Sequence, residues 1–352
     1  MLKPSNFSLD PSKRVLVTGA GGFIGGHLIA RLRREGFSQL RAVDCKPLDE
    51  WYLSFDDVEQ LVLDLSHPDA CARGARGVDY VFHLAADMGG MGFIENNKAL
   101  CMLSVLTSTN MLVAAQEAGA QRYFYASSAC VYAADKQTTP DVAPLREADA
   151  YPAMPEDGYG WEKLFSERMA RHFLEDFGFE TRVARYHNVY GPHGTYMGGR
   201  EKAPAAISRK VAEAKLSGSG EIDIWGDGEQ TRSFTYVDDC VEGTLRLMSS
   251  SVVDPLNIGS SEMVTINELV SITEEIAGVK LRRRYTLDAP QGVRGRNSDN
   301  TRILSDLHWE PSTPLKDGME VVYRWVYDQL ASSRRWNGAG LANGALPGRR
   351  AG

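Results

Sequence analysis

The stretch KRVLVTGAGGFIG, residues 13–25, decides the fold of this chain. An apolar run that ends at Thr18 leads directly into Gly19, Gly22 and Gly25, a G-x-x-G-x-x-G arrangement. Glycines at such a turn let the backbone approach a pyrophosphate closely, and the helix that follows offers its positive N-terminus to the same group. The spacing therefore predicts the strand, turn and helix that open a dinucleotide-binding fold.

The same alternation continues downstream, because hydrophobic runs and helical patterns succeed one another from Lys13 to about Thr181. This is typical of βαβ units on a parallel sheet. The expected strands are Arg14–Thr18, Leu40–Asp44, Gln60–Asp64, Asp79–Ala85 and Arg122–Ser127. The expected helices are Ile24–Glu35, Asn97–Ala118 and Tyr159–Phe177. We predict an α/β protein with a Rossmann-type, doubly wound parallel sheet.

Beyond residue 188 the pattern loosens into short segments separated by glycine and proline, which indicates a smaller C-terminal substrate-binding domain. The expected domains are an NAD-binding domain at 13–188 with a return segment at 234–260, and a substrate-binding domain at 189–233 and 261–332. A capping box at Thr265 and Glu268 opens one helix of the second domain, and a last helix covers Lys316–Leu330. Residues 132–157 are expected to form a surface loop, and residues 333–352 a disordered tail.

Charge and composition exclude several classes of protein. The chain has 39 Lys and Arg against 46 Asp and Glu, a formal net charge of −7, whereas a general nucleic-acid binder needs a basic surface. No apolar signal segment opens the chain, and no stretch approaches the run of about eighteen apolar residues that spans a membrane. The five cysteines are widely spaced and the seven histidines show no ligand spacing. We expect a cytoplasmic protein without membrane spans, disulfides or a metal.

Acidic residues at strand ends indicate which dinucleotide binds. Asp44 closes the second expected strand 19 residues after Gly25, where its carboxylate can accept hydrogen bonds from a ribose and would repel a 2′-phosphate. NAD is therefore preferred over NADP. Asp64, at the end of the third expected strand, lies either near the adenine or in an ordinary turn.

Tyr159 and Lys163 are the first candidates for chemistry. Their spacing of four places both on one face of the expected helix, and a neighbouring ammonium favours the phenolate of a tyrosine. An isolated pair of this kind is most often a surface pair. Here it follows a dinucleotide fold and the pair Ser127-Ser128, so we predict that Tyr159 acts as a base.

Together these residues resemble the extended short-chain dehydrogenase/reductase family, whose members exchange hydride with NAD(P) through a Tyr-x-x-x-Lys pair and a preceding Ser. Within that family, several long strings resemble those of nucleotide-sugar 3,5-epimerases. The strings are AADMGGMGF at 85–93, YASSACVY at 125–132, GGREKAP at 198–204 and VRGRNSDN at 293–300. The resemblance covers nearly all of residues 13–330.

The resemblance implies NAD as the cofactor, GDP-mannose or a related nucleotide sugar as the substrate, and a homodimer paired through the two long helices. The implied cofactor contacts are Gly19, Gly22, Phe23, Ile24, Gly25, Asp44, Asp64, Leu84, Ala85, Ala86, Tyr159 and Lys163. The implied substrate contacts are Gly90, Ser128, Ala129, Cys130, Asn188, Glu201, Lys202, Ala203, Lys210, Gln230, Thr231, Arg232 and Arg294. The resemblance also implies that Cys130 and Lys202 form the acid/base pair that inverts two sugar carbons.

The chemistry requires oxidation first, because a hydrogen on carbon becomes removable only beside a ketone. We predict that Tyr159 takes the proton of the C4 hydroxyl, with Lys163 stabilising the phenolate and Ser128 binding the C4 oxygen. Inversion at C3 and C5 then needs two groups on opposite faces of the ring. A thiol with a pKa starting near about 8.5 and an amine starting near about 10.4 can both be tuned toward neutrality, so Cys130 and Lys202 fit this need.

An acidic protein must meet the two negative charges of a nucleotide sugar with placed cations. By resemblance, Arg232 and Arg294 clamp the diphosphate with their planar guanidinium groups, and Lys210 lies beside them. Three further arginines are expected on a solvated face: Arg283, Arg284 and Arg296.

Other functions stay open. A 4,6-dehydratase also oxidises C4, but such enzymes place an acidic residue after the active-site Ser or Thr, whereas Ala129 and Cys130 follow Ser128 here. A simple 4-epimerase needs no pair of Cys130 and Lys202. A non-catalytic NAD-sensing protein commonly lacks the tyrosine. Gly158 stands where the wider family has alanine, and a short insertion at 217–220 makes the nucleotide base the least constrained part of the substrate.

Overall fold

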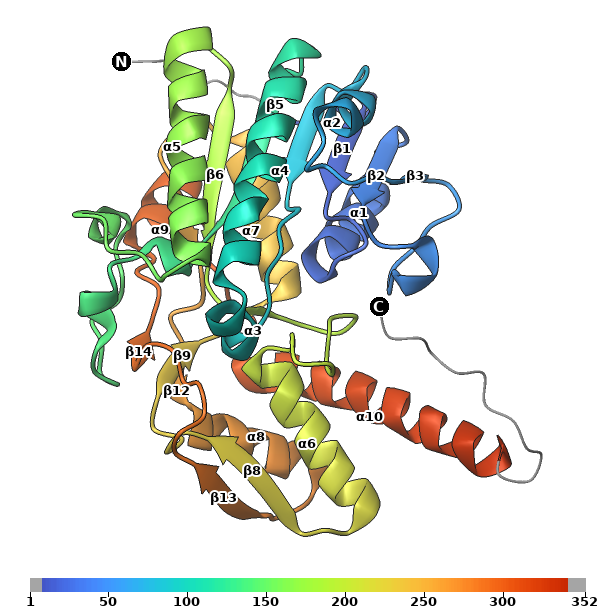
Figure 1. The fold of residues 1–352 in the computed structure, drawn as a ribbon, viewed down its shortest axis with the longest axis vertical. Coiled ribbons are helices and arrows are strands. Elements are labelled where there is room, and N and C mark those ends of the chain that lie inside the picture. The colour runs from blue at the N-terminus through green and yellow to red at the C-terminus, as the bar shows by residue number, and fades with distance from the viewer. Residues whose placement is uncertain (1–7, 341–352) are drawn as a thin grey trace.

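The computed structural model describes residues 8–340. Its upper lobe in Figure 1 is built on a seven-stranded parallel sheet with the order β11-β6-β5-β4-β1-β2-β3. The strands are β1 (Val15–Thr18), β2 (Leu40–Asp44), β3 (Glu59–Val62), β4 (Tyr80–His83), β5 (Arg122–Ser128), β6 (Thr181–Tyr186) and β11 (Leu256–Ile258). The chain winds outward from β1 in both directions, which confirms the predicted Rossmann-type topology.

Helices cover both faces of this sheet (Figure 1). One face carries α2 (Pro68–Ala75), α4 (Lys98–Glu117) and α5 (Tyr159–Phe177), and the other carries α1 (Phe23–Arg34) and α7 (Val237–Ser249). Strand β1 shows why: Val15 and Val17 pack among residues of α1 and α7, whereas Leu16 packs among residues of α2 and α4. Because side chains alternate across a strand, one continuous apolar run supplies the cores of both layers.

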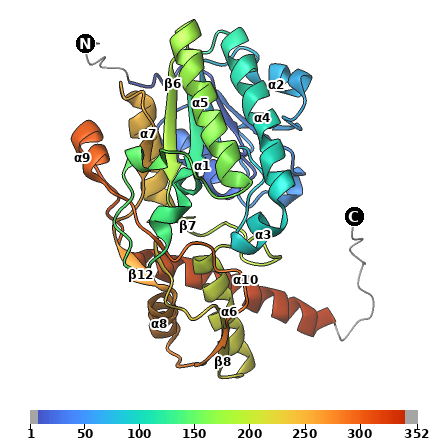
Figure 2. The ribbon, with the colours of Figure 1, turned by 60° about the vertical axis from the view of Figure 1, so that its left-hand side comes forward.

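The lower lobe is smaller and mixed (Figures 1 and 2). Its elements are α6 (Ala203–Ser217), α8 (Ile266–Ala277), α10 (Leu315–Gly340), the pair β8 (Glu221–Trp225) and β13 (Arg282–Thr286), and the sheet of β12 (Met263–Thr265), β9 (Thr231–Ser233) and β14 (Gly295–Arg296). The capping box predicted for α8 is present, since Glu268 N donates to Thr265 Oγ1 over 3.0 Å and Thr265 N donates to Glu268 Oε2 over 2.7 Å. The other short α-helices and strands are α3 (Met91–Asn96), β7 (Val189–Tyr190), β10 (Thr235–Tyr236) and α9 (Thr301–Leu307), and 3₁₀ turns lie at Leu48–Glu50, Ala129–Val131, Ala134–Gln137 and Glu147–Ala150.

Several segments differ from the expectations. The short helices α2 and α3 were not predicted, and α10 continues past Leu330 to Gly340; the rest of the expected tail, 341–352, lies outside the described residues. The segment 132–157 was expected to be a surface loop, but Val142 and Leu145 are buried, and Leu145 bridges Ser298. This proline-rich segment is anchored because its backbone pairs with a distant strand-like segment.

Among the described residues, α4 is the one helix long and apolar enough, by length and composition, to cross a membrane. This differs from the expectation that no stretch approaches that limit. In the structure α4 packs against α2 and α5, and Ser104 and Ser108 are buried. A helix packed in a protein core passes the same test, so the feature is weak evidence for a membrane.

Candidate active site

The glycine turn after β1 is shaped to receive a phosphate group. Gly19 has φ +70°, and a Cβ added there would come within 2.9 Å of the backbone nitrogen of Ala85. A Cβ at Gly25 would come within 2.2 Å of Gly19 O. Helix α1 has no acidic residue in its first turn and no side-chain cap at Gly22, so its free N–H groups can bind an anion. The turn therefore fits the pyrophosphate of a dinucleotide.

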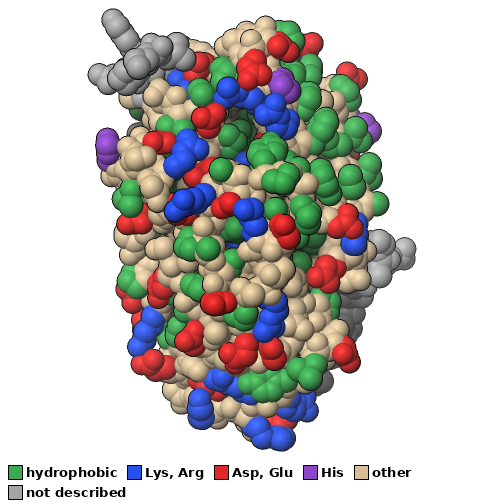
Figure 3. Space-filling view, turned by 90° about the vertical axis from the view of Figure 1, so that its left-hand side faces the viewer, with side chains coloured by type: hydrophobic (Ala, Val, Ile, Leu, Met, Phe, Trp, Pro, Cys, Tyr) green, Lys and Arg blue, Asp and Glu red, His purple; other side chains and the backbone are tan. Residues whose placement is uncertain are grey.

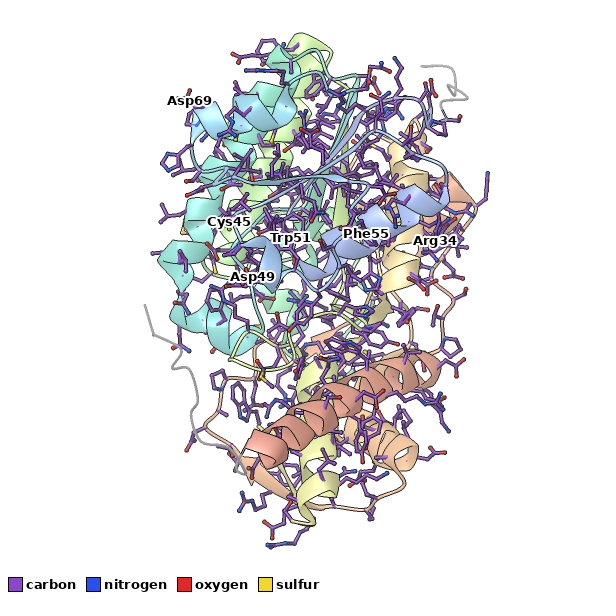
Figure 4. The ribbon with its side chains drawn as sticks, turned by 90° about the vertical axis from the view of Figure 1, so that its right-hand side faces the viewer. Arg34, Cys45, Asp49, Trp51, Phe55 and Asp69 are labelled. Carbon is purple, nitrogen blue, oxygen red and sulfur yellow. The ribbon has the colours of Figure 1, made fainter. Side chains whose placement is uncertain are left out.

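The loop after β2 covers the outer side of this turn. Figure 4 shows Trp51 beside α1, and a Cβ on Gly21 would lie 2.4 Å from the indole nitrogen of Trp51. Asp44 at the end of β2 is buried and accepts a hydrogen bond from Lys46 N over 3.0 Å, and the residue before it is joined to the glycine turn, because Val43 O accepts from Ala20 N over 3.1 Å. Asp64 is exposed and accepts from Ser66 N over 2.9 Å, so in this structure it closes a turn.

The remaining cofactor residues lie at the carboxyl ends of β1 and β4, next to the glycines. Leu84 N donates to Thr18 O over 3.2 Å, and Ala85 N lies 3.4 Å from Thr18 Oγ1. Ala86 follows in the same segment, while Phe23 and Ile24 open α1. In open α/β sheets ligands bind outside the carboxyl ends of the strands, so these positions suit the sugar and nicotinamide side of the cofactor.

A cavity of about 320 Å³ opens beside this edge, between the two lobes. Eleven of the thirteen expected substrate contacts line it: Gly90, Ser128, Ala129, Cys130, Asn188, Glu201, Lys202, Ala203, Lys210, Gln230 and Arg232. Two do not line it. The hydroxyl of Thr231 donates to Pro140 O, and Arg294 forms an ion pair with Asp227 at 3.0 Å, so both side chains have partners elsewhere in the structure.

Tyr159 and Lys163 share one side of α5, and both are buried. The Lys163 ammonium lies 5.4 Å from the centre of the Tyr159 ring. It donates to Tyr125 OH over 3.2 Å and lies 3.5 Å from Glu162 Oε2. Glu162 is itself buried and accepts from Ser108, Tyr125 and Ser166, each over 3.1 Å. The lysine charge is therefore balanced by a buried carboxylate that sequence reasoning missed.

The environment of Tyr159 favours the neutral phenol when no ligand is present. Burial raises the pKa of Tyr159 well above its usual 10.0, and electrostatic interaction with Cys130 and Glu162 acts in the same direction. A hydrogen bond with Ser128 lowers the Tyr159 pKa. Deprotonation therefore requires further positive charge near the phenol oxygen.

Cys130 lies in a 3₁₀ turn directly after β5, held close to the start of α5. Ser128 Oγ accepts a hydrogen bond from Cys130 N over 3.2 Å, and Cys130 O accepts from Glu156 N over 3.0 Å. A Cβ on Gly160 would come within 2.3 Å of Cys130 O. A glycine at 160 therefore allows the close approach that brings Cys130 beside Tyr159. Gly158 has φ +73°, a conformation that suits glycine better than the alanine usual in the wider family.

Arg296 corrects an expectation. It was expected on a solvated face, but its side chain is 5% exposed and lines the cavity. Its guanidinium donates to Gln137 Oε1 over 2.7 Å, pairs with Glu156, and lies 3.7 Å from Cys130 Sγ. The segment 132–157, which was expected to be a surface loop, and strand β14 together create this buried position. Arg283 and Arg284 instead form ion pairs at the outer edge of the lower lobe.

Lys202 comes from the lower lobe, where it is the N-cap residue of α6. Burial lowers the pKa of Lys202 below its usual 10.5, while electrostatic interaction with Cys130 acts in the opposite direction. The cavity thus brings together a thiol from the sheet lobe and an amine from the other lobe. The amine is shifted toward its neutral form, which is the form that can accept a proton.

The far end of the cavity is basic and aromatic. Arg232 is buried and donates to Thr231 O and Gln291 O, over 2.7 Å and 3.1 Å. Burial lowers its pKa to about 10, so the guanidinium stays charged at neutral pH. Lys210 donates to Asp223 O over 2.8 Å and lies 5.8 Å from the ring centre of Trp225. The Oε1 atom of Gln230 is buried without a hydrogen-bond partner and is free to accept one from a ligand.

Comparison with known proteins agrees with this geometry. The model of the NAD dependent epimerase/dehydratase family matches residues 15–259. The chain belongs to this family. It is 47% identical to GDP-mannose 3,5-epimerase 1 of Oryza sativa subsp. japonica over 322 residues, covering 91% of this chain and 83% of the relative.

Two further comparisons span the same part of the chain. GDP-mannose 3,5-epimerase of Arabidopsis thaliana is 45% identical over 322 residues, covering 91% of this chain and 84% of that one. The solved structure of MoeE5 in complex with UDP-glucose and NAD is 31% identical, with a TM-score of 0.73, and covers 90% of this chain and 99% of that one. The predictions of an NAD-using nucleotide-sugar epimerase of the extended dehydrogenase/reductase type are confirmed.

Some residues of the site in this member of the epimerase/dehydratase family were not predicted from its sequence. The cavity is also lined by Met88, Met91, Tyr186, Arg209, Asp223, Trp225, Phe234, Gln291 and Arg296. Four of these nine, Met88, Met91, Gln291 and Arg296, lie in or next to the strings already noted at 85–93 and 293–300, and the other five lie outside them. Membership in those strings was the available signal, but it does not separate residues that face the cavity from residues that pack away from it.

Proposed function

We propose that this protein epimerises GDP-mannose at C3 and C5, through transient oxidation at C4, to GDP-L-galactose, with GDP-L-gulose as the product of a single inversion. The observation that supports this most is that Cys130 and Lys202 line one cavity from different lobes, next to Tyr159 and Ser128. A 4-epimerase does not need the first pair. The names of the two plant relatives support the choice of sugar nucleotide.

The first half of the reaction belongs to the sheet lobe. When bound, NAD supplies a reversible hydride acceptor, and its positively charged ring favours the phenolate of Tyr159. Tyr159 takes the proton of the C4 hydroxyl, while Ser128 donates a hydrogen bond to the C4 oxygen. Glu162 lies 3.5 Å from the Lys163 ammonium and balances its charge. The buried site can therefore tolerate both this ammonium and the positively charged nicotinamide ring of bound NAD.

The second half needs both lobes. Once C4 is a ketone, the hydrogens on C3 and C5 become acidic, and inversion requires removal from one face and return to the other. Cys130 stands on the sheet side of the cavity and Lys202 on the α6 side, which supports opposite-face delivery. Lys202 accepts or returns a proton readily because burial lowers its pKa. Return of hydride to C4 regenerates the cofactor, so no external redox partner is consumed.

The test is incubation of the purified holoprotein with GDP-mannose in deuterated water, followed by mass spectrometry and NMR of the sugar. Deuterium at C3 and C5 without other change in mass supports the proposal. Loss of 18 mass units would indicate a dehydratase, and an unlabelled, unchanged sugar would contradict any epimerisation of this substrate. Cys130→Ala is expected to abolish inversion while NAD stays bound, and a fully active variant would refute its role.

We also propose a homodimer formed through the outer faces of α4 and α5. Six large apolar residues there are exposed: Leu100, Met102, Leu103, Leu106, Trp161 and Phe165. Figure 3 shows hydrophobic side chains gathered at the upper right of the molecule, on the side of these helices. A continuous exposed apolar patch favours a protein partner. Sedimentation is expected to give a dimer that Leu103→Glu dissociates, and a wild-type monomer at micromolar concentration would contradict this.

A further inference from the structure

Lys202 stands at the end of the segment 198–202, which begins with two glycines that do not fix its local conformation. Gly198 and Gly199 have φ +92° and +87°, and no atom lies within 4 Å of where their Cβ atoms would be. Such glycines allow several backbone conformations. When a lysine must reach one face of a bound sugar, a displacement of about 1 Å lowers the rate of proton transfer steeply. The segment 198–202 therefore needs contacts that fix it against the lobe that binds the cofactor.

Arg200 makes those contacts with the segment 87–93 of the sheet lobe. Its guanidinium carbon lies 3.8 Å from the centre of the Phe93 ring. Its Nη1 atom lies 3.3 Å from Asp87 Oδ1 and 3.3 Å from Met88 O. A cation stacked on an aromatic face and paired with a carboxylate is held in one orientation. Figure 1 shows the same juxtaposition, with α3 at the foot of α4 against the chain that leads to α6.

The backbones of the two segments also touch. Gly90 N donates to Arg200 O over 2.9 Å, and a Cβ on Gly90 would come within 2.4 Å of Glu201 O. On its own lobe, Glu201 is fixed by Arg209 at 3.2 Å and by Gly199 N at 2.7 Å. The residues directly before Lys202 are thus clamped on both sides, and Arg200 supplies the side-chain part of the contact that joins the two lobes.

We propose that Arg200 is a positioning residue for Lys202: with Phe93 and Asp87 it forms a latch that holds the Lys202 segment against the sheet lobe. The inference rests on the proposed function, because it matters only if Lys202 exchanges protons with the sugar. Tyr159, Ser128 and the glycine turn lie entirely on the sheet lobe, so the latch affects proton exchange at carbon and leaves the oxidation at C4 intact.

The experiment compares two rates in the same holoenzyme. Deuteride transfer from C4-deuterated GDP-mannose to bound NAD, read by mass spectrometry of the quenched cofactor, reports oxidation. Deuterium uptake at C3 and C5 from deuterated water reports proton exchange. For Arg200→Ala we expect the rate of deuteride transfer to stay unchanged. We expect deuterium exchange at C3 and C5 to become about tenfold slower, because one stacked and paired cation is lost. Lys202→Met is the reference, with deuteride transfer kept and exchange lost.

A matched control exists on the opposite side of the sheet lobe. Arg33 lies 4.4 Å from the ring centre of Phe55 and pairs with Asp57 at 2.7 Å, the same three residue types in the same arrangement; Figure 4 labels Phe55 beside α1. Arg33→Ala is expected to leave both rates unchanged. Partial recovery by Arg200→Lys, which keeps the charge without the planar stack, would support positioning.

The outcomes are separable. A wild-type enzyme that shows no exchange contradicts the proposed function itself. Wild-type exchange that Arg200→Ala leaves unaltered overturns the latch alone, and so does an equal loss of deuteride transfer and exchange, which indicates general damage. If Arg200→Ala does not fold, Phe93→Leu removes the aromatic face while keeping an apolar side chain. The ratio of the exchange rate to the rate of deuteride transfer in that variant then tests the latch.

Discussion

Gly160→Ala tests whether the close contact between α5 and the Cys130 turn sets the reacting geometry. The added Cβ would lie 2.3 Å from Cys130 O and 3.1 Å from Pro155 Cβ. An ordinary contact begins near 3.4 Å, so the two segments must separate by about 1 Å. Overpacking of this kind costs about 1–3 kcal/mol of stability. A displacement of about 1 Å between Cys130 and Tyr159 is expected to lower kcat about a hundredfold.

The assay is deuterium uptake at C3 and C5 together with urea denaturation of the same variant. Gly74→Ala is the control, because Gly74 is also in a helix but its added Cβ would meet nothing closer than 4.0 Å. That variant is expected to keep full activity and to gain up to about 1 kcal/mol from helix propensity. If Gly160→Ala folds with wild-type kcat, the spacing of these two segments does not control the reaction.

Three further tests concern titratable groups in or near the site. Arg296→Met leaves Glu156 unpaired in a nearly buried position and is expected to cost about 3 kcal/mol in urea denaturation, most of it recovered by adding Glu156→Gln. Burial lowers the pKa of Lys202 below 10.5. The rate of deuterium exchange at C3 and C5 should therefore rise with pH and become constant before pH 10.5 is reached. Lys202→Arg should remove this rise, because arginine stays protonated. Burial lowers the pKa of His187 to about 4. Below about pH 6.5 the unfolded chain therefore binds a proton at His187 that the folded chain does not bind. The free energy of unfolding should fall by up to about 3 kcal/mol between pH 6.5 and 4. His187→Asn should flatten that slope.

The fold was predictable because its local signals agree with one another. The apolar run of β1, the glycine turn and the helix after it each favour the same topology, and β2 and α5 have the bounds expected from sequence. Short elements such as α2 and α3 escaped because six to eight residues show too little periodicity. The end of α10 escaped because its last turns contain glycines, which weaken a helical pattern.

The candidate site was predictable only in part. Motifs identify the residue types, whereas the fold determines whether each side chain points into the cavity or away from it. Arg294 and Arg296 stand two residues apart in β14 and the chain before it, yet Arg294 pairs with Asp227 and Arg296 enters the cavity beside Cys130. Nothing in the string VRGRNSDN distinguishes them. Likewise Glu162 looks like an exposed helix residue beside Lys163, but packing of α4 against α5 buries it.

The division of the site between two lobes has a consequence for how its functions fail. Tyr159 and Lys163 on α5 and Ser128 at the end of β5 belong to the same lobe as the glycine turn, so loosening the lower lobe should leave hydride transfer intact. In the proposed mechanism, Lys202 reaches the sugar only while the segment 198–202 stays docked on segment 87–93, through contacts at the surface between the lobes. A damaged interface should therefore give an enzyme that oxidises C4 and reduces it again without inverting either neighbour. Such uncoupling would not occur if Lys202 were carried by the same lobe as Tyr159, Lys163, Ser128 and Cys130.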